Sequence, residues 1–105
     1  MRKAEVFNNN ILAGYLFENN HKYFFKYDEQ YLLDNNNPAI SLTLPKSKKV
    51  LISEYLFPFF FGLLSEGDNK KMQCEKLQIN EDDYFNMLLK TSNHDTAGGI
   101  TVREL

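Results

Sequence analysis

The sequence has one cysteine, no tryptophan and little excess charge of either sign. The cysteine count and the charge each exclude a class of protein. With Cys74 alone, no intrachain disulfide can form and no metal site can be built from paired cysteines. We predict that Cys74 acts as a small buried hydrophobe. The net charge of -2 leaves no basic stripe of the kind that a general nucleic-acid binder shows, so we expect no direct nucleic-acid partner.

Long apolar runs are also missing. The most apolar stretch, residues 56–64, is far shorter than the roughly 20 residues of a membrane-spanning helix. The first ten residues, MRKAEVFNNN, carry positive charge without the apolar run that defines a signal peptide. We therefore expect no membrane partner and a cytoplasmic location.

Recognisable catalytic motifs are absent as well. The best candidate is His94 beside Asp95, with Ser92 and residues 98–99 nearby, but adjacent residues rarely orient their side chains into a dyad. No nucleophile elbow, zinc-protease helix or phosphate loop surrounds them. The acidic residues 81–83 suit a helix N-terminus and lack the spacing of a calcium loop. We expect no enzymatic activity, no cofactor and no metal, and we interpret Asp95 as tying down its own loop.

What the chain does contain is a small, aromatic core. Its 105 residues are 43% hydrophobic and include nine Phe and six Tyr, enough for one domain over residues 1–105. In the first third, short apolar segments flank residues 8–10 and 19–20, which are all asparagine and favour hairpin turns. In residues 22–27, one face carries Lys22, Phe24 and Lys26 and the other carries Tyr23, Phe25 and Tyr27. These features predict an antiparallel meander.

The rest of the chain is predicted to mix helices with single strands. A helical turn is expected at residues 28–33, and helices near residues 57–64, 69–77 and 84–91. Extended segments are expected at residues 40–44, 50–52 and 100–102. We predict Ser53 as a helix N-cap before the first full helix and Asn80 as the N-cap of the last. The fold class is α+β: a small antiparallel sheet, made of the N-terminal meander and a returning C-terminal strand, packed with about three short helices.

The segment FPFFFGLLSEG, residues 57–67, concentrates aromatic side chains in one short helix. A helix in a small domain buries only one stripe, yet these rings point around more than half of its circumference. Part of the set must build the core, and at least one ring is expected to face outward. Exposed aromatic surface usually marks a site that binds a partner.

Five short motifs, in order along the chain, resemble the N-terminal domain of HipA-type serine/threonine kinases. Residues 10–16 (NILAGYL) are similar to its "nG..vG.L" opening, and residues 23–32 (YFFKYDEQYL) to "y.F.Yd..yl". Residues 41–45 (SLTLP) match "slSLP", residues 59–67 (FFFGLLSEG) resemble "fF.nLLPEG", and residues 95–100 (DTAGGI) resemble "Dc.GAl". Together they span nearly the whole chain.

Two departures from that family bear on function. Ser65 replaces the usual proline, and the sequence ends at Leu105, where a HipA kinase continues into its kinase lobes. A free-standing version of this domain resembles HipS, the small subunit of three-part HipB–HipS–HipT systems. The resemblance implies an antitoxin that binds a HipT-like serine/threonine kinase toxin non-covalently and holds it inactive. A HipB-like helix-turn-helix protein would bind DNA in the same complex.

The aromatic segment and the turn after it are the predicted partner interface: Phe57, Phe59, Phe60, Phe61, Leu64, Ser65, Glu66, Gly67 and Asp68. When a domain that packs on a kinase becomes a separate chain, its packing surface becomes an interface between proteins. The alternative is a subunit that stabilises or positions the kinase, or assists the DNA-binding complex, without neutralising it.

Overall fold

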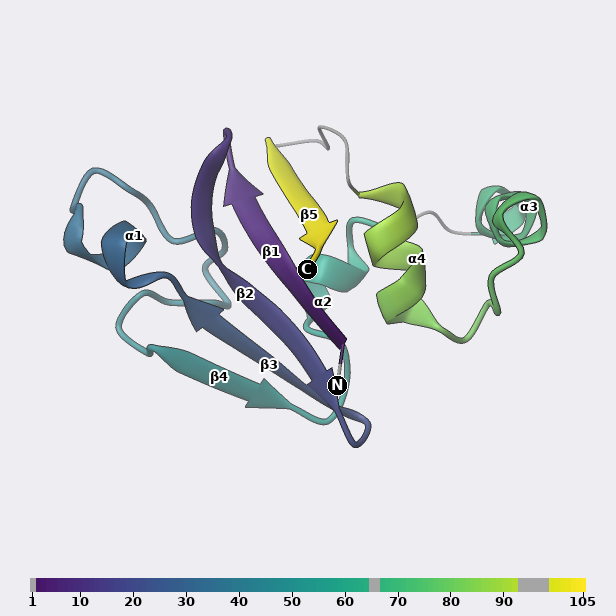
Figure 1. Ribbon diagram of the computed structural model, residues 1–105, viewed down its shortest axis with the longest axis horizontal. Coiled ribbons are helices and arrows are strands. Elements are labelled where there is room, and N and C mark those ends of the chain that lie inside the picture. The colour runs from purple at the N-terminus through teal and green to yellow at the C-terminus, as the bar shows by residue number, and fades with distance from the viewer. Residues whose placement is uncertain (1, 65–66, 93–98) are drawn as a thin grey trace.

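The computed structural model describes residues 2–64, 67–92 and 99–105, and its centre is an antiparallel sheet with strand order β4-β3-β2-β1-β5 (Figure 1). The strands are β1 (Arg2–Asn8), β2 (Ile11–Asn19), β3 (Lys22–Tyr27), β4 (Val50–Ser53) and β5 (Ile100–Glu104). All neighbouring strands pair antiparallel. The predicted meander and the returning C-terminal strand are therefore confirmed, and the class is α+β.

Asparagine-containing turns close both hairpins of the meander. The turn between β1 and β2 consists of Asn9 and Asn10, with φ of 50° and 69°, and the turn between β2 and β3 consists of Asn20 and His21, with φ of 52° and 63°. Two successive positive φ angles are typical of the type I′ turn, whose twist matches that of the strands. Asparagine tolerates this conformation, which is why the sequence predicted these turns correctly.

The sheet has one covered face and one open face. Alternate residues of the first three strands point into the core: Ala4, Val6, Leu16, Phe25 and Tyr27 are all buried. The residues between them form the opposite face, where Phe17 of β2 pairs with Phe24 of β3. This alternation confirms the pattern predicted for residues 22–27 and separates the molecule into a core side and an open side.

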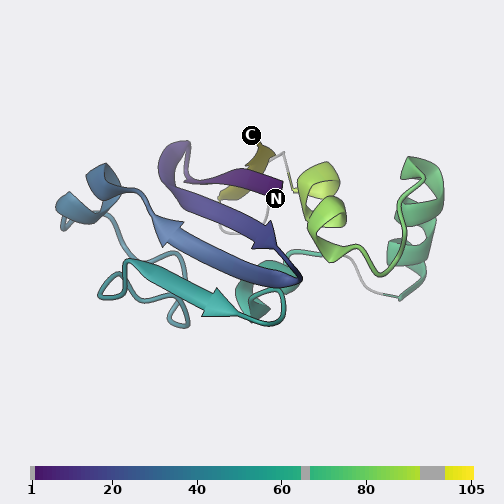
Figure 2. The same ribbon diagram turned by 60° about the horizontal axis from the view of Figure 1, so that its bottom comes forward.

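The described residues form four helices beside the sheet: α1 (Glu29–Leu33), α2 (Pro58–Phe61), α3 (Gly67–Leu77) and α4 (Tyr84–Thr91). Asp28 caps α1 by accepting hydrogen bonds from the backbone N–H groups of Gln30 (3.1 Å) and Tyr31 (3.3 Å). Figures 1 and 2 place α1 at one end of the molecule, α4 beside the sheet at the other, and α3 beyond α4. Cys74 of α3 is buried, as predicted.

Residues 40–44, which the sequence predicts as a strand, form a turn instead. The backbone N–H of Leu44 donates to the carbonyl of Ser41 (3.1 Å), and that of Thr43 donates to the Ser41 hydroxyl oxygen (3.2 Å). Local bonds of this kind compete with strand pairing. The alternating leucines of this segment therefore do not line one face of a strand: Leu42 is fully exposed at the turn, and Leu44 is buried in the core.

Both predicted helix caps are wrong in position. Ser53 is the last residue of β4, and its hydroxyl oxygen accepts a hydrogen bond from the backbone N–H of Tyr55 (3.1 Å). The helix α2 begins five residues later, at Pro58. Proline fits there because the first turn of a helix needs no N–H donor. The N-cap of α4 is Asp83, whose carboxylate accepts from Asn86 (3.2 Å), whereas Asn80 caps the turn just before it.

Two kinds of feature are absent from the part of the chain that the structure describes. No described helix is long and apolar enough to cross a membrane. No three histidine, cysteine or carboxylate side chains within residues 2–64, 67–92 and 99–105 come together as a group that could hold a metal ion.

Candidate functional site

The aromatic segment divides between the core and the surface. Phe57 and Phe60 are 6% and 0% exposed, and Leu64 is buried with them. Phe59 is half-buried, and Phe61 is 42% exposed. The expectation that at least one ring faces outward is therefore confirmed, and Phe61 is that ring.

The geometry of α2 explains this division. The helix has one turn, so residues three apart share a face: Phe57 and Phe60 meet with ring centroids 6.4 Å apart. Phe60 also packs on Phe25 of the sheet, at 5.7 Å. Phe61 points another way and meets the ring of Tyr84 edge-on at 5.2 Å. Phe57, Phe60 and Leu64, which the sequence placed in the predicted interface, are thus core residues.

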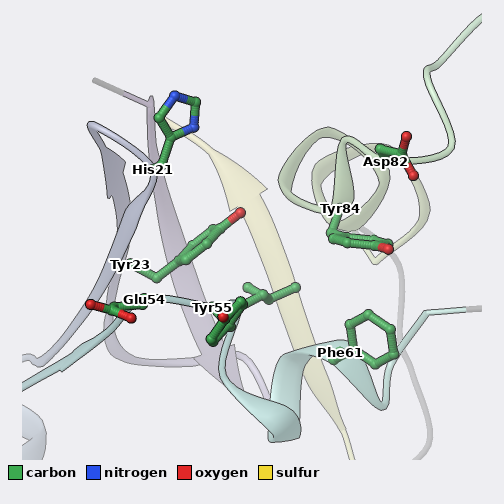
Figure 3. Close-up of a pocket in the computed structure, with 8 residues that line it drawn as sticks. His21, Tyr23, Glu54, Tyr55, Phe61, Asp82 and Tyr84 are labelled. Carbon is green, nitrogen blue, oxygen red and sulfur yellow. The ribbon is translucent and has the colours of Figure 1, made fainter.

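Phe61 lines an open cleft of about 310 Å³ between the sheet, α2 and the start of α4 (Figure 3). We call it the aromatic cleft, and its lining residues are His21, Tyr23, Glu54, Tyr55, Leu56, Phe61, Asp82 and Tyr84. Tyr55, in the segment between β4 and α2, is 78% exposed. In Figure 3 the rings of Phe61 and Tyr84 form one side of the cleft, and those of Tyr23 and Tyr55 lie across from them.

An ion-pair network fixes the wall of the cleft to the sheet. Arg2 of β1 pairs with Glu18 of β2 (2.7 Å) and with Asp83, the N-cap of α4 (2.9 Å). Its guanidinium lies 5.0 Å from the centre of the Phe85 ring, which stacks at 6.4 Å on Tyr23. Burial raises the pKa of the Tyr23 phenol, and the Glu18 carboxylate adds to this shift. The network holds α4, and therefore Tyr84, in place beside the sheet.

A second apolar surface lies on the open face of the sheet. We call it the outer sheet face, and it contains a shallow depression of about 320 Å³ lined by Lys3, Phe17, Asn19, Phe24, Lys26 and Val50. Beside it, Ile52 of β4 is 65% exposed. Lys3 lies 6.0 Å from the Phe17 ring, and Arg103 of β5 lies 5.1 Å from the Phe7 ring. The depression is apolar and basic, with Lys3 and Lys26 in its lining, whereas the aromatic cleft has two carboxylates on its rim.

The remaining predicted site residues are only partly placed. Gly67 and Asp68 are the first two residues of α3. Ser65 and Glu66, the predicted turn, lie outside the described residues, as do His94 and Asp95. Sequence reasoning missed Tyr23, Tyr55 and Tyr84, because only the tertiary fold brings these rings to Phe61. The one available signal was the density of tyrosine near the aromatic segment.

Comparison with known proteins agrees with the fold. A solved structure described as the N-terminal domain of HipA toxin superimposes with a TM-score of 0.76, covering 100% of this chain and 93% of that one at 24% identity. An uncharacterized protein of Haemophilus influenzae is 28% identical over 104 residues, which are 99% of this chain and 93% of that protein. The family model of the HipA N-terminal domain matches residues 4–103. The chain therefore belongs to the HipA N-terminal domain family.

Proposed function

We propose that this chain is the antitoxin subunit of a HipB–HipS–HipT-type toxin–antitoxin system. It binds a HipA-like serine/threonine kinase toxin non-covalently and neutralises it, in a complex that also holds a HipB-like helix-turn-helix protein. Membership of the HipA N-terminal domain family supports a HipA-related toxin–antitoxin context. The observation that carries the proposal further is the aromatic cleft, where exposed rings gather without a covering element among the described residues.

The cleft has the make-up of a protein-binding site. Aromatic side chains dominate the energetics of protein interfaces because they bury much area at little cost in side-chain entropy. Phe61 and Tyr55 are the exposed rings, and both adjoin buried neighbours, Phe60 and Leu56. Their backbone is therefore set by the core before any partner arrives, which lowers the ordering cost of binding.

We further propose that the chain itself catalyses nothing. The imidazole and carboxylate groups of the cleft, His21, Glu54 and Asp82, come from separate segments of the chain. Within residues 2–64, 67–92 and 99–105, none of their side chains is hydrogen-bonded to a serine, threonine or cysteine side chain. The purified chain should show no kinase, nucleotidyl-transfer or hydrolase activity, and it should bind ATP no more tightly than about millimolar. A tight nucleotide complex in calorimetry would overturn this part of the proposal.

Co-expression with the proposed HipT-like kinase partner tests the antitoxin role. The wild-type chain alone should restore growth to cells that make the kinase. The double variant Tyr55→Ala/Phe61→Ala should lose this protection, because it removes both exposed rings of the cleft. The matched control is Val50→Ala/Ile52→Ala, which removes two exposed apolar side chains of the outer sheet face.

Each outcome points to one reading. Protection by the wild type and by the control, but not by the cleft variant, supports the proposal. If the wild-type chain co-purifies with the kinase yet growth stays arrested, the chain is a structural subunit that stabilises or positions the kinase. If only the control variant fails, the interface lies on the outer sheet face.

A further inference from the structure

We infer that the aromatic cleft receives an arginine side chain of the partner protein. This inference rests on the proposed function and specifies the chemistry of the same site. It follows from three features of the cleft: the number of aromatic rings, the sign of the charges around them, and the fixed position of the walls.

Four aromatic side chains line one cleft. Tyr23 and Tyr55 come from the sheet side, and Phe61 and Tyr84 from the helical side, so that rings face each other across the opening (Figure 3). The faces of aromatic rings attract cations within about 6 Å of the ring centre. A planar guanidinium can also stack on such rings, which an ammonium group cannot do. Rings on two sides of the cleft therefore favour arginine over lysine.

The charges at the cleft have the complementary sign. Glu54 and Asp82 lie on opposite sides of the opening (Figure 3), and no lysine or arginine is among the eight described lining residues. Arg2, whose guanidinium lies over the Phe85 ring that stacks on Tyr23, is paired with Glu18 and Asp83 and not with either rim carboxylate. A guanidinium has five N–H donors and can bond a carboxylate while its face lies on a ring.

Other occupants fit this cleft less well. An acidic side chain would meet two carboxylates of the same sign, which is unfavourable. An aliphatic anchor would cover the rings but would desolvate Glu54 and Asp82 without pairing them. The cleft walls are held by the Arg2 network and by the core contacts of α2, so little rearrangement is needed for a cation to enter.

The first experiment uses the chain alone with a small probe. The chain is titrated with N-acetyl-arginine methylamide and, separately, with the matching citrulline derivative, which keeps the shape and lacks the charge. Ring resonances are followed by NMR up to about 100 mM, because one cation–π site of this kind binds weakly. The arginine probe should shift the signals of Tyr23, Tyr55, Phe61 and Tyr84, and the citrulline probe should shift them at most about one-third as much. Equal shifts with both probes, or no localised shift, would overturn the inference.

The second experiment uses the kinase. The double variant Glu54→Gln/Asp82→Asn should bind it about tenfold more weakly at low salt, with the difference shrinking as salt rises. The control is Glu75→Gln/Glu104→Gln, which changes the net charge equally at two exposed residues of α3 and β5; its affinity should stay within about twofold. An unchanged affinity for the cleft variant would overturn the inference. The proposed function would survive that result if the wild-type chain still restored growth.

The third experiment asks whether the chain binds a second copy of itself through this cleft. The outer sheet face presents Arg103, so a second copy of this chain is another source of a guanidinium. Sedimentation of the isolated chain should show a monomer. A dimer abolished both by Glu54→Gln/Asp82→Asn and by Arg103→Gln would assign the cation to a second copy and overturn the assignment to the partner.

Discussion

At the residue scale, Gly14 is the position where the sheet tolerates no side chain. A Cβ atom placed there would lie 2.4 Å from the carbonyl oxygen of Lys26, a backbone atom of the neighbouring strand. We predict that Gly14→Ala lowers the free energy of unfolding by about 1–3 kcal/mol, because β2 and β3 must move apart. Urea denaturation measures this change.

Gly62→Ala is the matched control. A Cβ at Gly62 would meet its nearest atoms at 3.4 Å, and its φ of −66° suits any residue. We expect a change within about 0.5 kcal/mol for this variant. If Gly14→Ala were as harmless as the control, the strands would not approach as closely at Gly14 as the structure has them.

Tyr27 links the sheet to the turn that follows α1. Its hydroxyl donates to the carbonyl of Leu44 and accepts from the backbone N–H of Ile40 (3.1 Å). Tyr27→Phe should lower the free energy of unfolding by about 1–3 kcal/mol, because both backbone groups lose a partner on the edge of the core. Chemical denaturation at neutral pH tests this expectation.

The same phenol predicts a pH dependence. Burial raises the pKa of Tyr27 above its usual value of 10.0, so the folded state holds this proton more tightly than the unfolded state does. The corresponding stability is fully present below pH about 10 and is lost as the pH rises through the folded-state pKa. Above pH about 10, the free energy of unfolding of Tyr27→Phe should therefore fall less steeply with pH than that of the wild type. Identical slopes for the two proteins would contradict this.

At the scale of elements, sequence patterns predicted most segments and failed where local bonds compete. Residues 22–27 form a strand because their alternation meets a core on one side. Residues 40–44 alternate similarly but form a turn, because the hydroxyl and carbonyl oxygens of Ser41 accept hydrogen bonds from the backbone N–H groups of residues 43 and 44. Periodicity alone does not separate these cases. The shortness of α2 was equally hidden, since the position of Pro58 fixes where it starts but not where it ends.

Helix α3 offers a prediction at this scale. It ends at Leu77, and the next residue, Gln78, has φ of 57°, while the N–H of Ile79 donates to the carbonyl of Cys74 (2.9 Å). This is the Schellman arrangement, in which glycine is preferred at the left-handed position. Gln78→Gly should raise the free energy of unfolding by about 0.5–1 kcal/mol.

Lys71→Gly, in the exposed interior of the same helix, is the opposing control and should lower stability by about 1 kcal/mol. Thermal unfolding followed by circular dichroism compares the two variants. Destabilisation by both glycines would mean that the helix does not end in a left-handed residue at Gln78.

At the scale of the whole molecule, the site was less predictable than the fold. The density of rings in residues 57–67 predicts that one faces outward, but only the contact of Phe60 with Phe25 determines that Phe61 is the exposed one. Tyr55 and Tyr84 lie beside Phe61 because of tertiary packing, and the local spacing of residues does not predict such contacts. The Arg2–Glu18–Asp83 network joins residues far apart in the sequence, so no local pattern could reveal it.

The measurement that tests the central claim most directly is the kinase affinity of Phe61→Ala, determined by calorimetry alongside its melting temperature. Phe61 is 42% exposed and is not one of the buried core residues, so the variant should lose much less folding stability than Phe60→Ala while its affinity falls by on the order of 2 kcal/mol, or roughly thirtyfold. Phe60→Ala should instead lose about 3–5 kcal/mol of folding stability, because its ring is fully buried. If Phe61→Ala folds normally and binds the kinase at full strength, the aromatic cleft is not the kinase interface.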